Sequence, residues 1–230
     1  MKRLNNTYII GDLNCQSYRL MMKIELKKLN NSHIIVLGNY GIGVLYQDIE
    51  KRNLSNINQK LKSNNSKIYL LKGDKDKDEL YKKYKNKYSN IIFASDYQII
   101  NINNINFMFV GGSVTHDRVF DFNHKRKTLN DFNEYEIRNI PNIDIVLSHE
   151  NVDFIHPYNL HNLKPFTRLD KWLYNDTKKK KKSLSKLYET LKTKNHKIKS
   201  WYSSKHNINL IERKNFTNFI QLEKLNMVKL

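Results

Sequence analysis

The chain has 230 residues, with 41 lysines and arginines against 22 acids, so its formal net charge at pH 7 is +19. Hydrophobic residues make up 39% and recur in periodic runs, which excludes a disordered chain. The length suits one domain over residues 1–230, and no run reaches the roughly 18 apolar residues of a membrane-spanning helix.

The expected compartment follows from the cysteine count and the start of the sequence. The single cysteine, Cys15, excludes an internal disulfide and fits a reducing environment. Residues 1–3 lead into a strand pattern rather than the apolar core of a signal peptide. We therefore expect a cytoplasmic protein that does not bind membranes. The abundance of Asn, Lys and Ile is typical of an AT-rich genome, whether of a host, a phage or a virus, so part of the lysine excess reflects coding bias.

Predicted strands and helices alternate through the first part of the chain. Short apolar runs predict strands at 8–10, 33–37 and 67–71, and apolar residues at helical spacing predict helices at 17–29, 46–61 and 79–88. This order is typical of a parallel sheet with right-handed crossovers.

The pattern changes at residue 91. Strands are predicted at 91–93, 96–102 and 105–110, with Asn103 and Asn104 as a hairpin turn. Helices are predicted at 131–140 and 183–194, and further strands at 143–147, 197–202, 208–212 and 216–222. The economical fold is a mixed α/β sandwich of two sheets flanked by helices.

Polar residues follow the predicted strands, at the end where open α/β sheets bind ligands. In chain order the segments are Asp12 and Asn14, Gly38-Asn39, Gly73-Asp74-Lys75-Asp76, Ser148-His149, and Ser204-Lys205-His206. We expect these segments to meet at one rim of the sandwich.

Their order and spacing resemble the calcineurin-like metallophosphoesterases, which carry D-x-H, G-D, G-N-H-[DE], a single H and G-H-x-H at successive strand ends. The resemblance runs from Tyr8 to about Leu222. It includes the stretch from Gly111 to Arg118, which is similar to a Gly-Gly turn of one bacterial and phage branch. The resemblance implies a two-sheet fold and hydrolysis of phosphate esters at two metal ions.

The departures from the family pattern fall on the ligands that the resemblance implies. Three residues match the family pattern: Asp12, His149 and His206. Two histidines of the family are replaced, by Asn14 and Ser204, and Lys75 replaces the catalytic histidine. Asn39 replaces the aspartate that bridges the metals, and Asp74 stands where asparagine is usual. A neutral amide offers one weak carbonyl oxygen and no charge, so it does not offset the repulsion between two cations. We do not expect a two-metal centre.

Three interpretations of this rim stay open. Asp12, Asp74, His149 and His206 form a donor set acceptable for one Mn, Zn or Fe ion. Alternatively, Lys75, Lys205 and Arg118 bind a phosphate group without activating water, or the cleft is retained only as architecture. The favoured hypothesis is a pseudoenzyme, a binding or structural protein with an anionic partner. The alternative is an active phosphoesterase with one metal or an atypical site.

A lysine-rich segment at 171–199 carries eleven lysines, five of them consecutive at 178–182. It is either a solvated loop or helix face, or a surface for nucleic acid or a phosphorylated ligand. No zinc-finger spacing or aromatic ribonucleoprotein motif accompanies it.

Overall fold

The first sheet has five strands, in the order β11-β1-β2-β3-β4. We describe a computed structural model, which covers residues 4, 6–115, 140–155 and 164–230. Strands β1 (Asn6–Ile10), β2 (Ser32–Val36), β3 (Lys67–Leu70) and β4 (Ile91–Phe93) run parallel, and β11 (Met227–Lys229) pairs antiparallel with β1. The central strands are nearly continuous apolar runs because both of their faces are buried.

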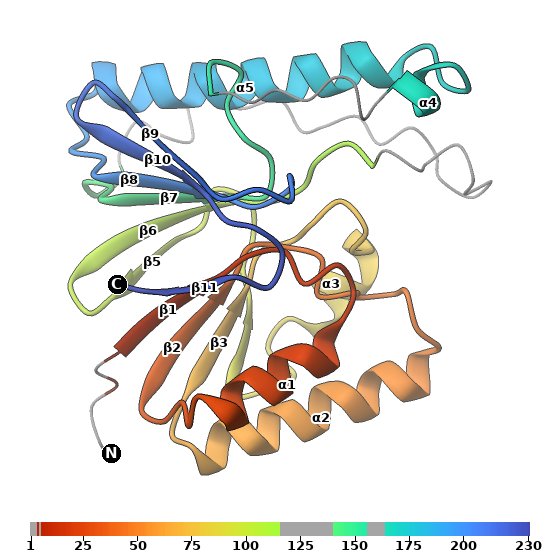
Figure 1. The fold of residues 1–230 in the computed structure, drawn as a ribbon. Helices are drawn as coiled ribbons and strands as arrows, with labels where there is room; N and C mark the ends of the chain where they lie inside the picture. The colour runs from red at the N-terminus through yellow and green to blue at the C-terminus, as the bar shows by residue number, and fades with distance from the viewer. Residues whose placement is uncertain (1–3, 5, 116–139, 156–163) are drawn as a thin grey trace.

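Helices α1 (Ser17–Leu26), α2 (Gln47–Ser63) and α3 (Asp78–Tyr84) cover the outer face of this sheet (Figure 1). Leu20 and Ile24 of α1 pack in the same apolar cluster as Leu54 and Leu61 of α2, at the spacing of one helical face. Helix α1 ends three residues before the predicted end because Lys28 takes a left-handed conformation, with φ of 47°.

The second sheet has six strands, in the order β5-β6-β7-β8-β10-β9. The strands are β5 (Ile99–Ile102), β6 (Ile105–Val110), β7 (Ile145–Ser148), β8 (Ser200–Ser203), β9 (Leu210–Lys214) and β10 (Thr217–Gln221). Strands β6, β7, β8 and β10 are parallel. Asn103 and Asn104 both have positive φ and close the β5–β6 hairpin as predicted.

Helix α5 (Leu173–Thr193) covers the outer face of the second sheet, after the short helix α4 (Lys164–Thr167) (Figure 1). The prediction of a helix at 183–194 was wrong about its start, which lies ten residues earlier. After Leu173, the next buried positions of α5 are Thr177, Lys180 and Lys181. Because these residues are polar, the sequence shows no apolar stripe there.

The two sheets lie face to face between the helical layers, so most buried apolar side chains of the described residues fall in three large clusters, and a small fourth one joins Val114 to Leu173. One lies under α1 to α3, one between the sheets, and one under α5. The predicted mixed α/β sandwich is confirmed. No helix in the described part of the chain has both the length and the apolar character to cross a membrane. The predicted helix at 131–140 falls, apart from Ile140, outside the described residues.

Candidate functional site

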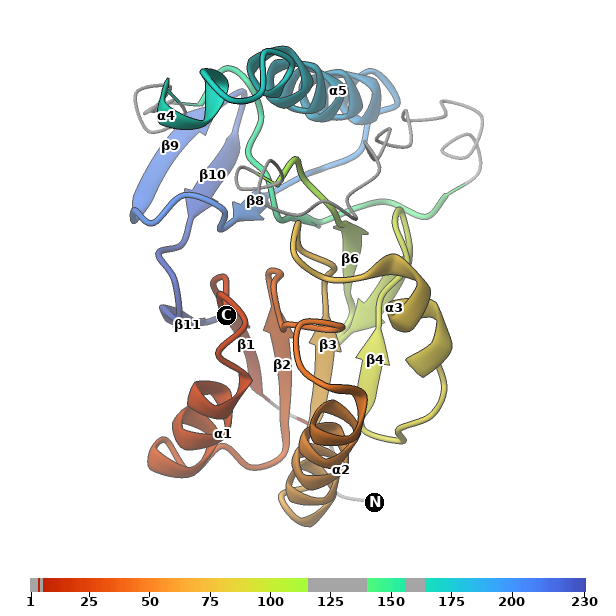
Figure 2. The ribbon, with the colours of Figure 1, turned by 90° about the vertical axis from the view of Figure 1, so that its right-hand side faces the viewer.

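The polar strand ends of both sheets meet at one rim (Figure 2). Asp12, Asn39 and Asp74 follow β1, β2 and β3, and His149 follows β7 of the other sheet. Two glycines allow the close approach: a Cβ on Gly38 would lie 2.3 Å from His149 Nδ1, and one on Gly73 would lie 2.1 Å from Asn39 Oδ1.

The Asn39 side chain lies between the two carboxylates. Its Nδ2 donates to Asp12 Oδ2 at 3.1 Å and to Asp74 Oδ1 at 2.8 Å. Its Oδ1 accepts the Lys75 backbone N–H at 2.9 Å, which fixes the amide orientation, because the opposite orientation would set that N–H against an NH2 group. The group that faces both acids is therefore a hydrogen-bond donor.

His149 forms a buried ion pair with Asp74. Its Nε2 lies 2.9 Å from Asp74 Oδ1 and its Nδ1 lies 2.8 Å from the Leu37 carbonyl, and both partners are acceptors, so both ring nitrogens carry protons. Burial alone would lower the pKa of His149, but the hydrogen bond and charge of Asp74 raise it to about 9. Burial would raise the pKa of Asp74, but Lys205 and His149 outweigh burial and lower it.

Asp12 is the second carboxylate of this network. Its burial, assisted by the charge of Asp74, raises its pKa against the opposing effect of His149. Asn14 joins through its backbone N–H, which donates to Asp12 Oδ1 at 2.6 Å. The fully buried Ser204 accepts the Asp12 backbone N–H and donates to the Leu222 carbonyl at 2.9 Å. Ser204 therefore holds the loop after β1 rather than facing a ligand.

These side chains do not fit the two-metal centre that the resemblance implies. The NH2 group of Asn39 occupies the position between the acids and has no lone pair to give a cation. A doubly protonated His149 has no ring lone pair for a cation either, until it loses the Nε2 proton that it donates to Asp74. Within the described part of the chain, no group of three or more His, Cys, Asp and Glu side chains has the arrangement of a metal site.

His206, predicted as a fourth metal ligand, belongs instead to a second network around Glu150. The fully buried Glu150 carboxylate lies 3.0 Å from His206 Nε2, 3.3 Å from Lys205 Nζ and 3.6 Å from Lys181 Nζ. It also accepts a hydrogen bond from Ser113 Oγ at 2.8 Å. Burial would raise the pKa of Glu150, but the surrounding cations hold it well below its ordinary value.

The three residues expected to bind phosphate have different surroundings. Lys205 Nζ donates to Ser113 Oγ and the Val114 carbonyl and pairs with Glu150, so its three protons have partners within the protein. The charge of Lys75 acts on Cys15, where it opposes the burial and the Asp76 charge that raise the thiol pKa to about 12. Arg118 lies outside the described residues.

Sequence reasoning missed Glu150 and Lys181 as members of the rim, and it placed Asp76 there without giving it a role. Asp76 is buried and accepts the backbone N–H groups of Gly41, Ile42 and Gly73, so it anchors the loop after β2 to the loop after β3. An acid directly after the strand-end histidine was a usable signal for Glu150. Nothing in the lysine run distinguishes Lys181 from its neighbours.

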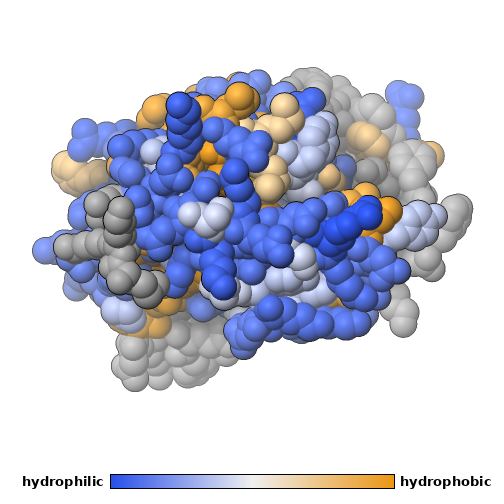
Figure 3. Space-filling model, turned by 90° about the horizontal axis from the view of Figure 1, so that it is seen from below, coloured by the Kyte–Doolittle hydropathy of each residue, from blue (hydrophilic) through white to orange (hydrophobic). Residues whose placement is uncertain are grey.

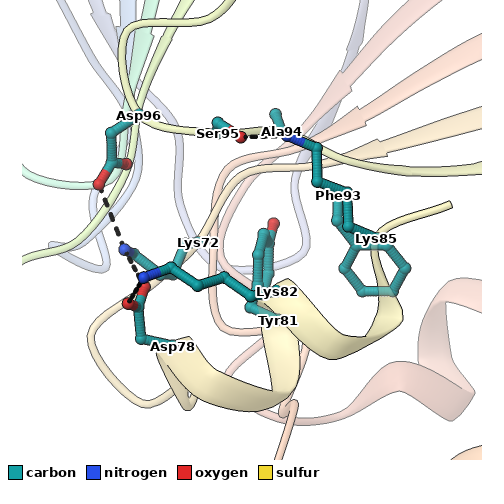
Figure 4. Close-up of a pocket in the computed structure, with 9 residues that line it drawn as sticks. All are labelled: Lys72, Asp78, Tyr81, Lys82, Lys85, Phe93, Ala94, Ser95 and Asp96. Atoms are coloured by element: carbon teal, nitrogen blue, oxygen red, sulfur yellow. Dashed lines mark hydrogen bonds and ion pairs between the residues drawn. The ribbon is translucent and has the colours of Figure 1, made fainter.

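A separate pocket of about 200 Å³ lies between α3 and the segment after β4 (Figure 4). Lys72 spans its base, 2.6 Å from Asp78 and 3.2 Å from Asp96, and Lys82 pairs with Asp78 at 3.1 Å. Lys85 donates to Ser95 at 2.9 Å on the rim. Three lysines and two aspartates line this pocket, and the ion pairs of Lys72 and Lys82 use both aspartates.

Comparisons with known proteins agree with the fold. A scan of protein-family models and a search of curated proteins find no match. One solved crystal structure is 10% identical over 95% of this chain and 90% of its own, with a TM-score of 0.52. GAP50, the anchor in the inner membrane complex of Plasmodium, is 12% identical over 96% and 72%, with a TM-score of 0.46. Vacuolar Protein Sorting 29 from Cryptosporidium parvum is 12% identical over 96% and 74%, with a TM-score of 0.37. Such identities show the arrangement of strands and helices alone.

Proposed function

We propose that this chain is a calcineurin-like phosphoesterase-fold protein without hydrolytic chemistry, which acts in the cytoplasm by binding an anionic partner. One observation carries the first part: the amide nitrogen of Asn39 donates to both strand-end carboxylates. A phosphoesterase of this fold needs a cation at that position to bind and activate water. Here the Asn39 amide donates hydrogen bonds to the acids, and the His149 imidazolium supplies the positive charge instead.

The competing function is a phosphoesterase with one metal ion. Its support is that Asp12, Asp74 and His149 all surround one point, since each lies within 3.4 Å of Asn39 Nδ2. A cation at this point would have to displace the Asn39 amide and the proton on His149. The geometry therefore favours the binding protein.

We expect the purified protein to bind no manganese and to hydrolyse neither p-nitrophenyl phosphate nor bis-p-nitrophenyl phosphate above background. The physical reason is that three donor protons face the site where a cation would need lone pairs. Calorimetric titration with manganese and a phosphate-release assay measure the two properties. The Asp12→Ala variant is the control for contaminating phosphatase, because turnover that this substitution abolishes would establish the one-metal enzyme.

The second part of the proposal places the anionic partner on the outer face of α5. Lys178, Lys182 and Lys186 recur every four residues on this helix and are exposed, and Lys179 is exposed beside them. Such a stripe attracts nucleic acid through its phosphates without reading its sequence. Lys180 and Lys181 are buried, so they are not part of the stripe.

For nucleic acid as the partner, replacing Lys178, Lys179 and Lys182 together by Gln should weaken binding to unrelated DNA duplexes by the same factor. The log–log salt dependence should become shallower by about one unit for each lysine that contacts a phosphate. Fluorescence anisotropy across a salt series measures both. The matched control replaces the exposed Lys82, Lys83 and Lys87 by Gln, which gives the same net charge. Equal losses from the two triple variants would reject α5 as the specific surface.

A further inference from the structure

Helix α1 carries apolar side chains on two faces, and only one of them packs in the core. Leu20 and Ile24 are fully buried against the first sheet. On the opposite side, Tyr18, Met22 and Leu26 recur every four residues and are 60%, 53% and 78% exposed. Burial of these three side chains against a partner would be favourable, because it removes apolar surface from water. A helix with apolar residues on both sides is usually buried on both sides.

A groove of about 710 Å³ runs beside this exposed face. The surface seen in Figure 3 is mostly hydrophilic, with hydrophobic side chains in separate small areas. The second wall of the groove is the segment 223–226 after β10. That wall is held in place: Leu225 donates its backbone N–H to the Asp12 carbonyl at 3.0 Å, and Glu223 N–H donates to Asn209 Oδ1 at 2.9 Å. The groove is therefore formed before any partner binds.

The walls of the groove are mainly basic. Arg19 and Lys23 of α1 and Lys224 on the opposite wall line it, against the single acid Glu223. Asn209 Nδ2 already donates to the Glu223 carboxylate at 3.1 Å. An apolar floor between cationic walls complements a ligand whose apolar residues are flanked by acids.

We propose that this groove docks an acidic amphipathic helix of a partner protein. The ten residues of α1 extend about 15 Å, which matches two to three turns of a helix with apolar anchors at i, i+3 or i+4, and i+7. A flat bilayer cannot fill a concave groove. A second copy of this chain would bring Arg19 and Lys23 against like charges. This inference goes beyond the proposed function, because it uses neither the strand-end site nor α5.

The test uses the full chain and two labelled peptides of about 14 residues. Both carry leucines at i, i+3 and i+7, one with glutamates and the other with lysines on the flanking positions. We expect the glutamate peptide to bind and the lysine peptide to bind about tenfold or more weakly. Leu26→Glu should weaken binding of the glutamate peptide by a similar factor, measured by fluorescence anisotropy. The double change of Arg19→Glu and Lys23→Glu should reverse the preference.

Ile211→Glu is the matched control, because Ile211 of β9 is also an exposed apolar residue, at 71%. This control should bind the glutamate peptide as the parent does. Because every replaced side chain is at the surface, unchanged circular dichroism and melting temperature should accompany each variant. Equal binding of the two peptides, or full binding by Leu26→Glu, would overturn the proposal. So would a parent dimer that Leu26→Glu dissociates in sedimentation, or Leu26-dependent binding to phosphatidylserine vesicles.

Discussion

Replacing Glu150 by Gln should lower the free energy of unfolding by about 3–5 kcal/mol, the usual cost of removing one partner from a buried ion pair. The substitution keeps the shape of the side chain but leaves Lys181 and Lys205 without the counter-charge that lies 3.6 and 3.3 Å away. Urea unfolding at neutral pH measures the loss. Helix α5 is held to the strand-end rim by this pair, so we expect α5 to lose protection from hydrogen exchange.

Glu25→Gln is the matched control, because Glu25 also pairs with a lysine, Lys60, at 3.2 Å, but its side chain is 56% exposed. The Glu25→Gln substitution should lower the free energy of unfolding by less than about 1 kcal/mol. The pKa of Glu150 is lowered from its ordinary value of 4.5, so its stabilisation is present above pH 4.5. It is lost as the pH falls below that value toward the lower folded-state pKa. The difference between the parent and Glu150→Gln should shrink in the same range. Equal losses from the two variants at neutral pH would show that the Glu150 network is solvated.

Replacing Asn39 by Asp should convert the network after β1, β2 and β3 into a site for one divalent cation. Without metal, three carboxylates would meet at one point, so the melting temperature should fall. With manganese at about a hundred times its dissociation constant, binding adds about 2.7 kcal/mol, which corresponds to a rise of about 5–10 °C in melting temperature. Asp12, Asp74 and neutral His149 would complete the donor set.

The matched control is Asn31→Asp. Asn31 precedes β2 and Asn39 follows it, and both asparagines have φ of 50°, so the same substitution is made at the same φ on the two sides of one strand. We expect the parent and Asn31→Asp to show no stabilisation by manganese in differential scanning fluorimetry. If Asn39→Asp also melts at the same temperature with and without manganese, the Asn39 amide is not what keeps a cation from this site.

Most strands of the fold could be predicted from the sequence because their signals are local. The runs before Gly11, Gly38 and Gly73 are apolar enough to be central strands, and polar residues follow each one. Strand β11 could not be predicted in the same way. It consists of only Met227–Lys229 and exists because it pairs with β1, more than two hundred residues earlier in the chain.

The candidate site was predicted as a set of residues but not as a set of contacts. Sequence order placed Asp12, Asn39, Asp74 and His149 at one rim, and the structure brings them together. His206 was expected with them, and it lies instead against Glu150. Side-chain packing across the two sheets, rather than the local sequence pattern, determines which of the two networks His206 joins.

By itself the sequence determined the two-sheet architecture, the positions of the polar strand ends and the excess of positive charge. Those properties depend on periodicity and composition, which each segment carries alone. Only the tertiary structure decided which lysine side chains are buried and which are exposed. Lys180 and Lys181 are consecutive members of a lysine run, yet they are buried, while Lys178, Lys179 and Lys182 are exposed. The reason is that burial of an ammonium depends on a partner such as Glu150, and that partner lies on another strand of the folded chain.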